Sequence, residues 1–364
     1  MIHDRTEAVM VHGGDVESYR GQYGGDIIDF SSNINPLGPP AGLKKEMDKA
    51  YSELSSYPDI RYRELKANIA AYLKCDAREV IVGNGAVDII NTVSAMFRRA
   101  VVFIPCFTEY GKRPAMLGRE EIRLPFGDFF AIDPERLADI LQSNDLLILG
   151  NPNNPTGLRI PEKTLMRIHD VVLRKNAFLL LDEAFFEFCP PDYDSVEQFK
   201  GSNRVCVIRA ATKFFALPGI RLGYGFTSAE FAEKYRNTEN PWSVNSYANA
   251  AGRCIFRDKD YIERTREYIR KEREYLFHEL SEIRWLRPCR SDANFILIKL
   301  TGQDEDTVFD RLIRNGILIR KASSFEGLNR GFIRIAVKDH DSNEKLIKLL
   351  GKEAFCVRKV RKGL

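Results

Sequence analysis

The sequence predicts an α/β protein with a mostly parallel central sheet flanked by helices, a smaller α+β domain and an N-terminal arm. Three observations carry this prediction. Short runs of Val, Ile, Leu and Phe recur through the middle of the chain with helical patterns between them, a long charged amphipathic stretch follows, and residues 1–44 are rich in glycine and proline. Strands that are apolar on both faces and separated by helices are typical of a parallel sheet covered on both sides.

The large domain is assigned to residues 45–255. Its strands are expected in five apolar runs, "VIVGNG" from Val80, "AVVFIPC" from Ala100, "DLLILGNP" from Asp145, "AFLLLDEAF" from Ala177 and "RVCVIRA" from Arg204. A chain of 364 residues is long enough to bury a large core and to carry a second, smaller domain.

The small domain is assigned to residues 256–364. It is expected to begin with one long helix over residues 260–283 and to continue with three alternating segments, "NFILIKL", "GILIRKA" and "GFIRIAV". The arm, residues 1–44, must pack on something to be ordered, and it is assigned to the same domain.

Composition narrows the function classes. Lys and Arg number 55 against 51 Asp and Glu, a bias too weak for nucleic-acid binding, and the basic run from Val357 to Gly363 is interpreted as a solvated tail. The seven cysteines contain no C-x-x-C pair, which favours reduced thiols over disulfides or a zinc site. No apolar run has signal-peptide or membrane-span length. We therefore expect a cytoplasmic protein with no metal, no nucleic-acid partner and no membrane partner.

Residues just after the predicted strands are the first candidates for a site, because ligands bind at the carboxyl ends of parallel strands. "VGNGA" places Gly83 and Gly85 there, ahead of a helix whose first amides could hold a phosphate. The motif is weak alone, since such a pair often makes only a turn, and Asp88 breaks the pattern G-x-G-x-x-G. "CFTEYG" offers the aromatic face of Phe107, although a lone Phe is usually core.

Four further polar residues follow predicted strands. Asn154 in "GNPNNPTG" could present an amide to a ligand or belong to a structural turn, and Asp182 in "LLLDEAF" could bind a ligand or form a buried salt bridge. "TKFFALPGIRLGYG" adds Lys213 and Arg221. Together they are the parts that pyridoxal phosphate requires: an amine for its aldehyde, an acid for its ring nitrogen, an amide for its ring oxygen, and a guanidinium for its phosphate beside the Gly85 turn.

With these motifs the chain resembles the fold-type I pyridoxal-phosphate enzymes of the class I/II aminotransferase superfamily. Within it, the similarity is greatest to the threonine-phosphate decarboxylases of cobalamin biosynthesis, followed by the histidinol-phosphate aminotransferases. The aminotransferases usually have Tyr at the position of Phe185 and lack the "HGG" and "SSNINPLG" arm in this form, which favours the decarboxylase. The resemblance rests on "HGGD", "DFSSNINPLGPP", "YPD", "GNG", "FTEYG", "NPNNPTGL", "LDEAFFEF", "TKFFALPGIRLGYG", "PWSVN", "ILIRKASSFEGL" and "FIRIAV".

The resemblance also implies roles for residues that the motifs alone leave open. Phe107 would stack on the cofactor ring. Thr212 would join Arg221 and the backbone of Gly85 and Ala86 around the cofactor phosphate, and Tyr57 would reach that phosphate from the partner subunit of a homodimer. The substrate would be held by His12, Gly13, Asn33, Asn154, Arg320 and Arg334.

Two departures from the family pattern bear on cofactor affinity. Ala210 stands three residues before the lysine, where the family often has Ser, and Ala86 follows "GNG", where the family often has an acidic or hydroxyl residue. Thr212 is thus the only hydroxyl beside Lys213, and we expect its loss to weaken cofactor binding most after the losses of Lys213 and Arg221.

The predicted reaction is the decarboxylation of L-threonine O-3-phosphate to (R)-1-amino-2-propanol O-2-phosphate, with L-serine O-phosphate, giving ethanolamine phosphate, as a second candidate substrate. Lys213 and Asp182 are the predicted catalytic residues. The first alternative is an aminotransferase of the histidinol-phosphate type, because the same residue types serve either reaction. The second is a non-catalytic pyridoxal-phosphate sensor, disfavoured because the chain starts with the arm and offers no helix-turn-helix segment.

Overall fold

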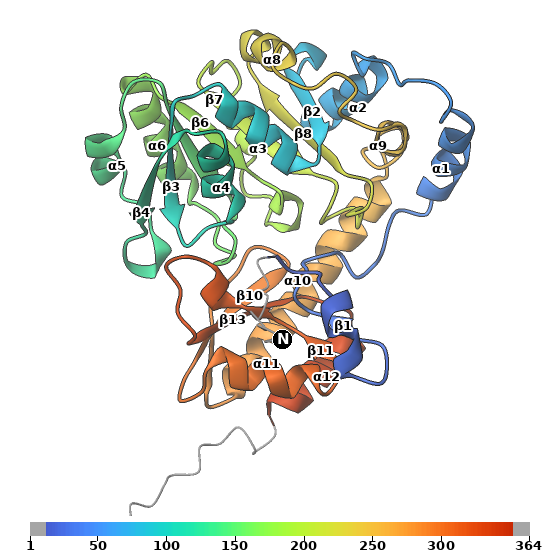
Figure 1. Cartoon of the computed structure of the whole chain (residues 1–364), viewed down its shortest axis with the longest axis vertical. Coiled ribbons are helices and arrows are strands. Elements are labelled where there is room, and N and C mark those ends of the chain that lie inside the picture. Colours follow the sequence, from blue (N-terminus) through green and yellow to red (C-terminus); the bar gives the residue numbers. More distant parts are fainter. Residues whose placement is uncertain (1–11, 352–364) are drawn as a thin grey trace, which may run out of the picture.

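The fold centres on a seven-stranded sheet with strand order β2-β8-β7-β6-β5-β3-β4, seen in a computed structural model that describes residues 12–351 (Figure 1). Strand β8 is antiparallel to both of its neighbours, and the other pairs are parallel, so the predicted α/β class is confirmed. The strands are β2 (Val80–Asn84), β3 (Arg99–Ile104), β4 (Glu120–Pro125), β5 (Asp145–Gly150), β6 (Phe178–Asp182), β7 (Val205–Ala210) and β8 (Leu222–Thr227).

Helices cover both faces of this sheet because its strands are apolar on both sides. Leu180 belongs to one hydrophobic cluster, with residues of α3, α4 and α8, whereas Leu179 and Leu181 belong to the other, with residues of α2 and α6. The helices of this part are α1 (Leu43–Ser52), α2 (Arg63–Leu73), α3 (Ala86–Ala95), α4 (Glu109–Met116), α5 (Pro134–Ile140), α6 (Glu162–Arg174), α7 (Ser195–Gln198), α8 (Ala229–Arg236) and α9 (Ser246–Ala251).

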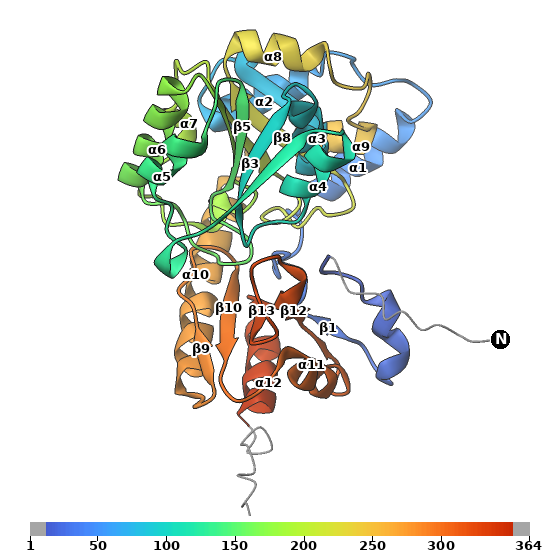
Figure 2. The ribbon, with the colours of Figure 1, turned by 60° about the vertical axis from the view of Figure 1, so that its left-hand side comes forward.

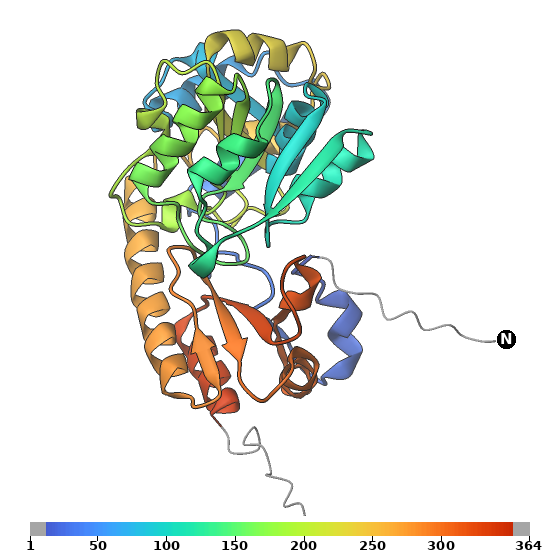
Figure 3. The ribbon, with the colours of Figure 1, turned by 90° about the vertical axis from the view of Figure 1, so that its left-hand side faces the viewer.

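The second layer of the molecule is a four-stranded antiparallel sheet with strand order β12-β13-β10-β9. Helix α10 runs along one side of the molecule from the large sheet to the small one (Figure 3). The elements are α10 (Lys259–Glu282), β9 (Leu286–Pro288), β10 (Phe295–Leu300), α11 (Glu305–Ile313), β11 (Ile317–Leu318), β12 (Arg320–Lys321), β13 (Phe332–Ala336) and α12 (His340–Leu350).

The described part of the N-terminal arm, from residue 12 onward, lies against the small sheet (Figure 2). Its strand β1 (Ile28–Asp29) pairs in parallel with β11, and the side chain of Asn294 donates a hydrogen bond to the carbonyl of Asn33 at 3.0 Å. Further along, the Asn35 amide donates to the carbonyl of Phe214 at 2.8 Å. The arm therefore touches both layers before α1 begins. The domain limits after residues 44 and 255 stay predictions.

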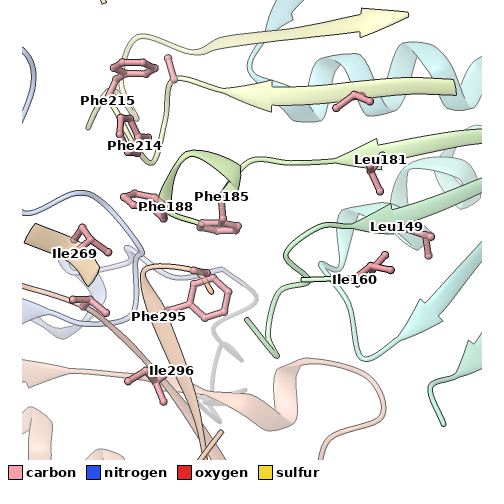
Figure 4. Close-up of a cluster of buried hydrophobic side chains, with 14 of the residues drawn as sticks. Leu149, Ile160, Leu181, Phe185, Phe188, Phe214, Phe215, Ile269, Phe295 and Ile296 are labelled. Atoms are coloured by element: carbon pink, nitrogen blue, oxygen red, sulfur yellow. The ribbon is translucent and has the colours of Figure 1, made fainter. Parts of the chain in front are cut away.

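One apolar core joins the two layers. Phe185, after β6, meets Phe295 of β10 edge to face, with ring centroids 4.9 Å apart, and both belong to the same buried cluster (Figure 4). A shared core of this kind fixes how the small sheet sits over the strand ends. It therefore fixes which side chains face one another across the site.

The predicted elements differ from the observed ones in particular places. Strands β4 and β8 lie outside the predicted runs, and the segment "GILIRKA" forms two short strands because Ile317 pairs with the arm whereas Arg320 pairs with Arg334. The six cysteines among the described residues are unpaired, and no helix there is long and apolar enough to cross a membrane. Cys356 and the basic run from Val357 to Gly363 lie outside the described residues.

Candidate active site

A cavity of about 410 Å³ lies at the carboxyl ends of β5, β6 and β7, and the arm and the small sheet close its other side. All but two of the predicted site residues line it; Gly85 and Tyr57 do not. Those that do are His12, Gly13, Asn33, Ala86, Phe107, Asn154, Asp182, Thr212, Lys213, Arg221, Arg320 and Arg334.

Lys213 follows β7 and turns its amine to the cavity. Its backbone carbonyl accepts a hydrogen bond from the backbone N–H of Asn35 at 3.1 Å, which connects this loop to the arm. Burial, followed by the charges of Arg334 and Arg221, lowers the pKa of the Lys213 amine to about 8. A neutral amine is thus accessible near neutral pH, and a neutral amine is the form that attacks an aldehyde.

Asp182 is a buried carboxylate at the end of β6. It accepts hydrogen bonds from the Tyr110 hydroxyl at 2.9 Å and from the backbone N–H of Ala184 at 3.0 Å. Burial raises the pKa of Asp182 to about 6, although both hydrogen bonds oppose that shift. The sequence left open a buried salt bridge at Asp182. Both hydrogen-bond partners of Asp182 among the described residues are neutral, so the structure shows no such salt bridge there. A cationic ring nitrogen would supply the missing positive charge.

Tyr110 was not predicted as a site residue. It stands in the predicted motif "FTEYG", in the first turn of α4, and Phe107 lies before that helix; both residues line the cavity. The two rings meet edge to face with centroids 5.6 Å apart, and membership of the motif is the sequence signal that could have directed attention to Tyr110.

The Gly85 turn and Arg221 form a cradle. Gly85 has a φ of +82°, and a Cβ atom there would lie 2.3 Å from Nη2 of Arg221. Gly223 is equally constrained, since its Cβ would lie 2.5 Å from the carbonyl carbon of Gly85. Helix α3 begins at Ala86 with no side-chain cap, so its first amides and its positive dipole end remain for an anion beside Arg221.

The opposite wall of the cavity is basic. Arg320 and Arg334 are register partners on β12 and β13, and both are buried. Arg334 donates to Oδ1 of Asn154 at 2.5 Å and to the carbonyl of Ser31 at 2.6 Å. Burial lowers the pKa of Arg320 to about 10, and burial together with the charge of Arg320 lowers that of Arg334 to about 9. Two desolvated guanidinium groups in one cavity favour a bound anion.

His12 and Glu109 complete this wall. Nε2 of His12 lies 3.1 Å from Oε1 of Glu109, whose side chain is 2% exposed, and Arg113 contacts the other carboxylate oxygen. Glu109, Arg113 and Phe325 line the cavity without having been predicted. Glu109 stood in the motif "FTEYG", but nothing in the sequence indicated that it would meet a residue of the arm.

Tyr57 lies on the surface of its own subunit. Its side chain is 79% exposed and contacts Trp242, with ring centroids 4.5 Å apart and the ring planes tilted by 31°. Tyr51, Leu54 and Ile60 are exposed nearby in sequence. The structure of one chain therefore leaves the predicted reach into a partner's site as a prediction.

Comparison with known proteins decides the family. Residues 25–350 match the sequence profile of aminotransferases of class I and II. The chain belongs to the class I and II aminotransferase family. Pyridoxal 5′-phosphate is the cofactor of this family, and the chain fits it on structural grounds: an amine faces the cavity at Lys213, an unpaired acid lies buried at Asp182, and the glycine cradle meets Arg221.

Individual relatives of this chain include proteins named as decarboxylases and proteins named as aminotransferases. A protein of Caldanaerobacter subterraneus subsp. tengcongensis named "Putative threonine-phosphate decarboxylase" is 40% identical over 90% of this chain and 93% of its own. The threonine-phosphate decarboxylase of Salmonella typhimurium is 33% identical over 93% of this chain and 95% of its own. Among solved structures, the histidinol-phosphate aminotransferase of Clostridium acetobutylicum is 35% identical, with a TM-score of 0.84 over 88% of this chain and 97% of its own.

Proposed function

We propose that the protein is a pyridoxal-phosphate-dependent decarboxylase of L-threonine O-3-phosphate that forms (R)-1-amino-2-propanol O-2-phosphate for the cobalamin nucleotide loop. One observation carries the proposal: two buried arginines and a histidine share a cavity with Lys213. A small amino acid with two anionic groups matches that charge pattern. The relatives named threonine-phosphate decarboxylase support the same substrate.

The two anionic groups of the substrate are assigned to different ends of the wall. Arg334 is bonded to Asn154 and is the strongest charge acting on Lys213, so we assign the carboxylate to Arg334. The charge of Arg320 lowers the pKa of His12, so we assign the phosphate to those two side chains and to the Gly13 backbone. Asn33 lies at the join of arm and small domain, where the Asn294 hydrogen bond holds it.

The cofactor would be held by Lys213, Asp182, Asn154, Thr212, Arg221 and Phe107. When bound to the substrate amine, it draws electrons from whichever Cα bond stands perpendicular to its ring. The protein's part would be to orient the substrate: Arg334, fixed by Asn154 and Ser31, would hold the carboxylate and so select the bond that breaks. Asp182 would stabilise a protonated ring nitrogen, and Lys213 in its ammonium form would supply the proton that replaces the lost carboxylate at Cα.

An aminotransferase of the histidinol-phosphate type is the second candidate function. The similarity to the aminotransferase of Clostridium acetobutylicum favours it, because the shared residue types can orient either bond. Phe185 favours the decarboxylase: its ring lines the cavity, packs on Phe295 and offers no hydroxyl.

Carbon dioxide release from O-phospho-L-threonine by the purified holoenzyme tests the assignment. We expect gas and 1-amino-2-propanol O-2-phosphate in equal amounts. Absence of gas, together with amino transfer from glutamate to imidazole acetol phosphate, would replace the proposal with the aminotransferase. O-phospho-L-serine should react more slowly, since one methyl in an apolar contact discriminates by about 1 to 3 kcal/mol.

We further propose a homodimer in the cytoplasm in which Tyr57 reaches the partner's cofactor phosphate. Two exposed aromatic side chains in contact, Tyr57 and Trp242, support an interface at this surface. Mixing Lys213→Ala and Tyr57→Phe subunits tests it, because a hybrid dimer regains one site with both native residues. Tighter cofactor binding in the mixture than in Tyr57→Phe alone is expected, and unchanged binding would refute the shared site.

A further inference from the structure

Glu109 is an acidic residue on the wall where the substrate's phosphate is proposed to bind. It belongs to the first turn of α4, and its carboxylate contacts three basic side chains, His12, Lys112 and Arg113. Arg113 contacts Oε2, whereas Oε1 lies 3.1 Å from Nε2 of His12 and 3.9 Å from Nζ of Lys112. An acid beside an anion site would repel the ligand unless it acts through another residue.

The Oε1 atom of Glu109 is an unsatisfied acceptor. It is buried and has no hydrogen bond of strict geometry among the described residues, although Nε2 of His12 lies within hydrogen-bond distance of it at 3.1 Å. A buried carboxylate oxygen without a donor is unfavourable. A ring N–H donated to Oε1 would satisfy it, and the half-exposed side chain of His12 is within reach.

Histidine chemistry connects this oxygen to the substrate. A neutral imidazole has one N–H donor and one acceptor, whereas an imidazolium donates from both nitrogens. If Nε2–H bonds to Glu109, Nδ1 can donate to a phosphate only when the ring is charged. A carboxylate on the far side of the ring favours that charged form.

We propose that Glu109 is a positioning residue for the substrate's phosphate, holding the His12 ring by Nε2–H and stabilising its charged form so that Nδ1–H donates to the phosphate. The inference rests on the proposed function only in placing a phosphate monoester at this end of the cavity. It assigns a role to the acid of "FTEYG", which the cofactor chemistry does not use.

Charges around His12 set the expected pH dependence. Burial lowers the pKa of His12, the charges of Arg320 and Lys112 lower it further, and Glu109 opposes them. The free site thus holds a neutral ring near pH 7, and a bound dianion, placed against the ring, would draw a proton onto it. Binding should therefore take up a proton and weaken as pH rises from about 6 to 8, the range in which His titrates.

A double-mutant cycle tests the role. Glu109→Gln should raise KM for O-phospho-L-threonine about tenfold and leave kcat within about twofold, the size expected for one charged hydrogen bond. In a His12→Ala background the same substitution should raise KM by less than about twofold, because Glu109 acts on the phosphate through His12. Glu121→Gln, another glutamate paired with an arginine but outside the cavity, is the matched control and should leave KM unchanged.

Sulfate inhibition of the holoenzyme supplies a readout that does not depend on which reaction is catalysed. Sulfate is a dianion that does not titrate near pH 7, so any pH dependence of its inhibition constant comes from the protein. In the wild type this constant should rise with pH, and in Glu109→Gln the same rise should occur at lower pH. Glu109→Asp, which keeps the charge, should recover part of the loss. Equal losses in both His12 backgrounds, or identical pH profiles for sulfate, would overturn the inference.

Failure of the proposed function has a different signature. If the wild type releases no carbon dioxide, the decarboxylase assignment falls while the sulfate profile still tests Glu109. If carbon dioxide is released and the cycle is additive, Glu109 has no role through His12. The visible absorbance of the bound cofactor in each variant shows that the variant has folded.

Discussion

The two walls of the cavity differ in how they are built. The wall where the cofactor is expected comes from the ends of neighbouring strands and the turn before α3. In it, Asp182 accepts a hydrogen bond from Tyr110, and the backbone of Gly85 packs against the guanidinium of Arg221. The opposite wall, where we propose that the substrate binds, joins a residue of the arm, His12, to Arg320 and Arg334 of the small sheet.

This difference separates local from long-range organisation. One sheet places the cofactor residues, because parallel strands end at a common edge. The substrate residues depend on contacts between distant segments, such as the bond from Arg334 to the carbonyl of Ser31. Variants in the first wall should change cofactor chemistry, and variants in the second should change substrate recognition.

The largest expected effect is the loss of Lys213. Lys213→Ala removes both the attachment point and the proton donor, and the proton transfer alone is worth about a hundredfold to ten-thousandfold in rate. Borohydride reduction should fix the cofactor covalently to the wild type and not to the variant, as read by intact mass. A covalent adduct at another residue of the variant would refute the assignment of Lys213.

Loss of Arg334 tests the substrate wall. Arg334→Gln removes a buried charge and leaves Asn154 and the carbonyl of Ser31 without their donor, so kcat/KM should fall about a hundredfold, as for truncation of a buried charged contact. Cofactor affinity should change less than threefold, roughly within the error of independent sites. Arg330→Gln, which changes an exposed arginine paired with Asp306, is the control and should leave kcat/KM and cofactor affinity unchanged. A larger loss of cofactor than of substrate affinity would move Arg334 to the other wall.

Asp182→Asn separates stability from catalysis within the cofactor wall. The folded pKa of about 6 lies above the ordinary Asp value of about 3.9, so the unfolded chain ionises first and the cofactor-free protein loses stability as pH rises from about 4 to 6. The neutral variant should lack that loss and be more stable by about 1 to 3 kcal/mol at pH 7.5. Denaturant unfolding of both cofactor-free proteins at pH 4 and 7.5 measures it, whereas turnover should fall steeply. If the wild type and the variant have equal free energies of unfolding at both pH values, folding does not raise the pKa of Asp182.

Thr212 and Ala210 give the smallest effects. Thr212→Val removes one hydroxyl from the cofactor phosphate and should weaken cofactor binding about tenfold, as expected for one hydrogen bond to a charged group. Ala210→Ser restores a donor at a position lining the cavity and should strengthen binding a few-fold. Titration of the cofactor-free proteins with pyridoxal phosphate measures both. No change in either would mean that backbone amides and Arg221 alone hold the phosphate.

Much of the cofactor wall could be predicted because its residues stand in strand-end motifs. Asn154, Asp182 and Lys213 each follow an apolar run, and sheet geometry alone implies that such ends meet. Tyr110 escaped prediction although it shares a motif with Phe107, since only the tertiary structure directs its hydroxyl to Asp182. Strand β4 at the sheet edge and strand β8 between β2 and β7 also escaped, because their apolar pattern is weaker in β4 and interrupted by Gly223 and Gly225 in β8.

The sequence by itself determined the fold class, the family and the residue types of the cofactor wall, since these depend on local periodicity and on motifs within short segments. Only the tertiary structure decided that His12 meets Glu109 and that Arg334 bonds to Asn154, for these pairs join the arm, helix α4 and the small sheet. Their contacts depend on how one shared core sets the small sheet over the strand ends, and no local pattern encodes that packing.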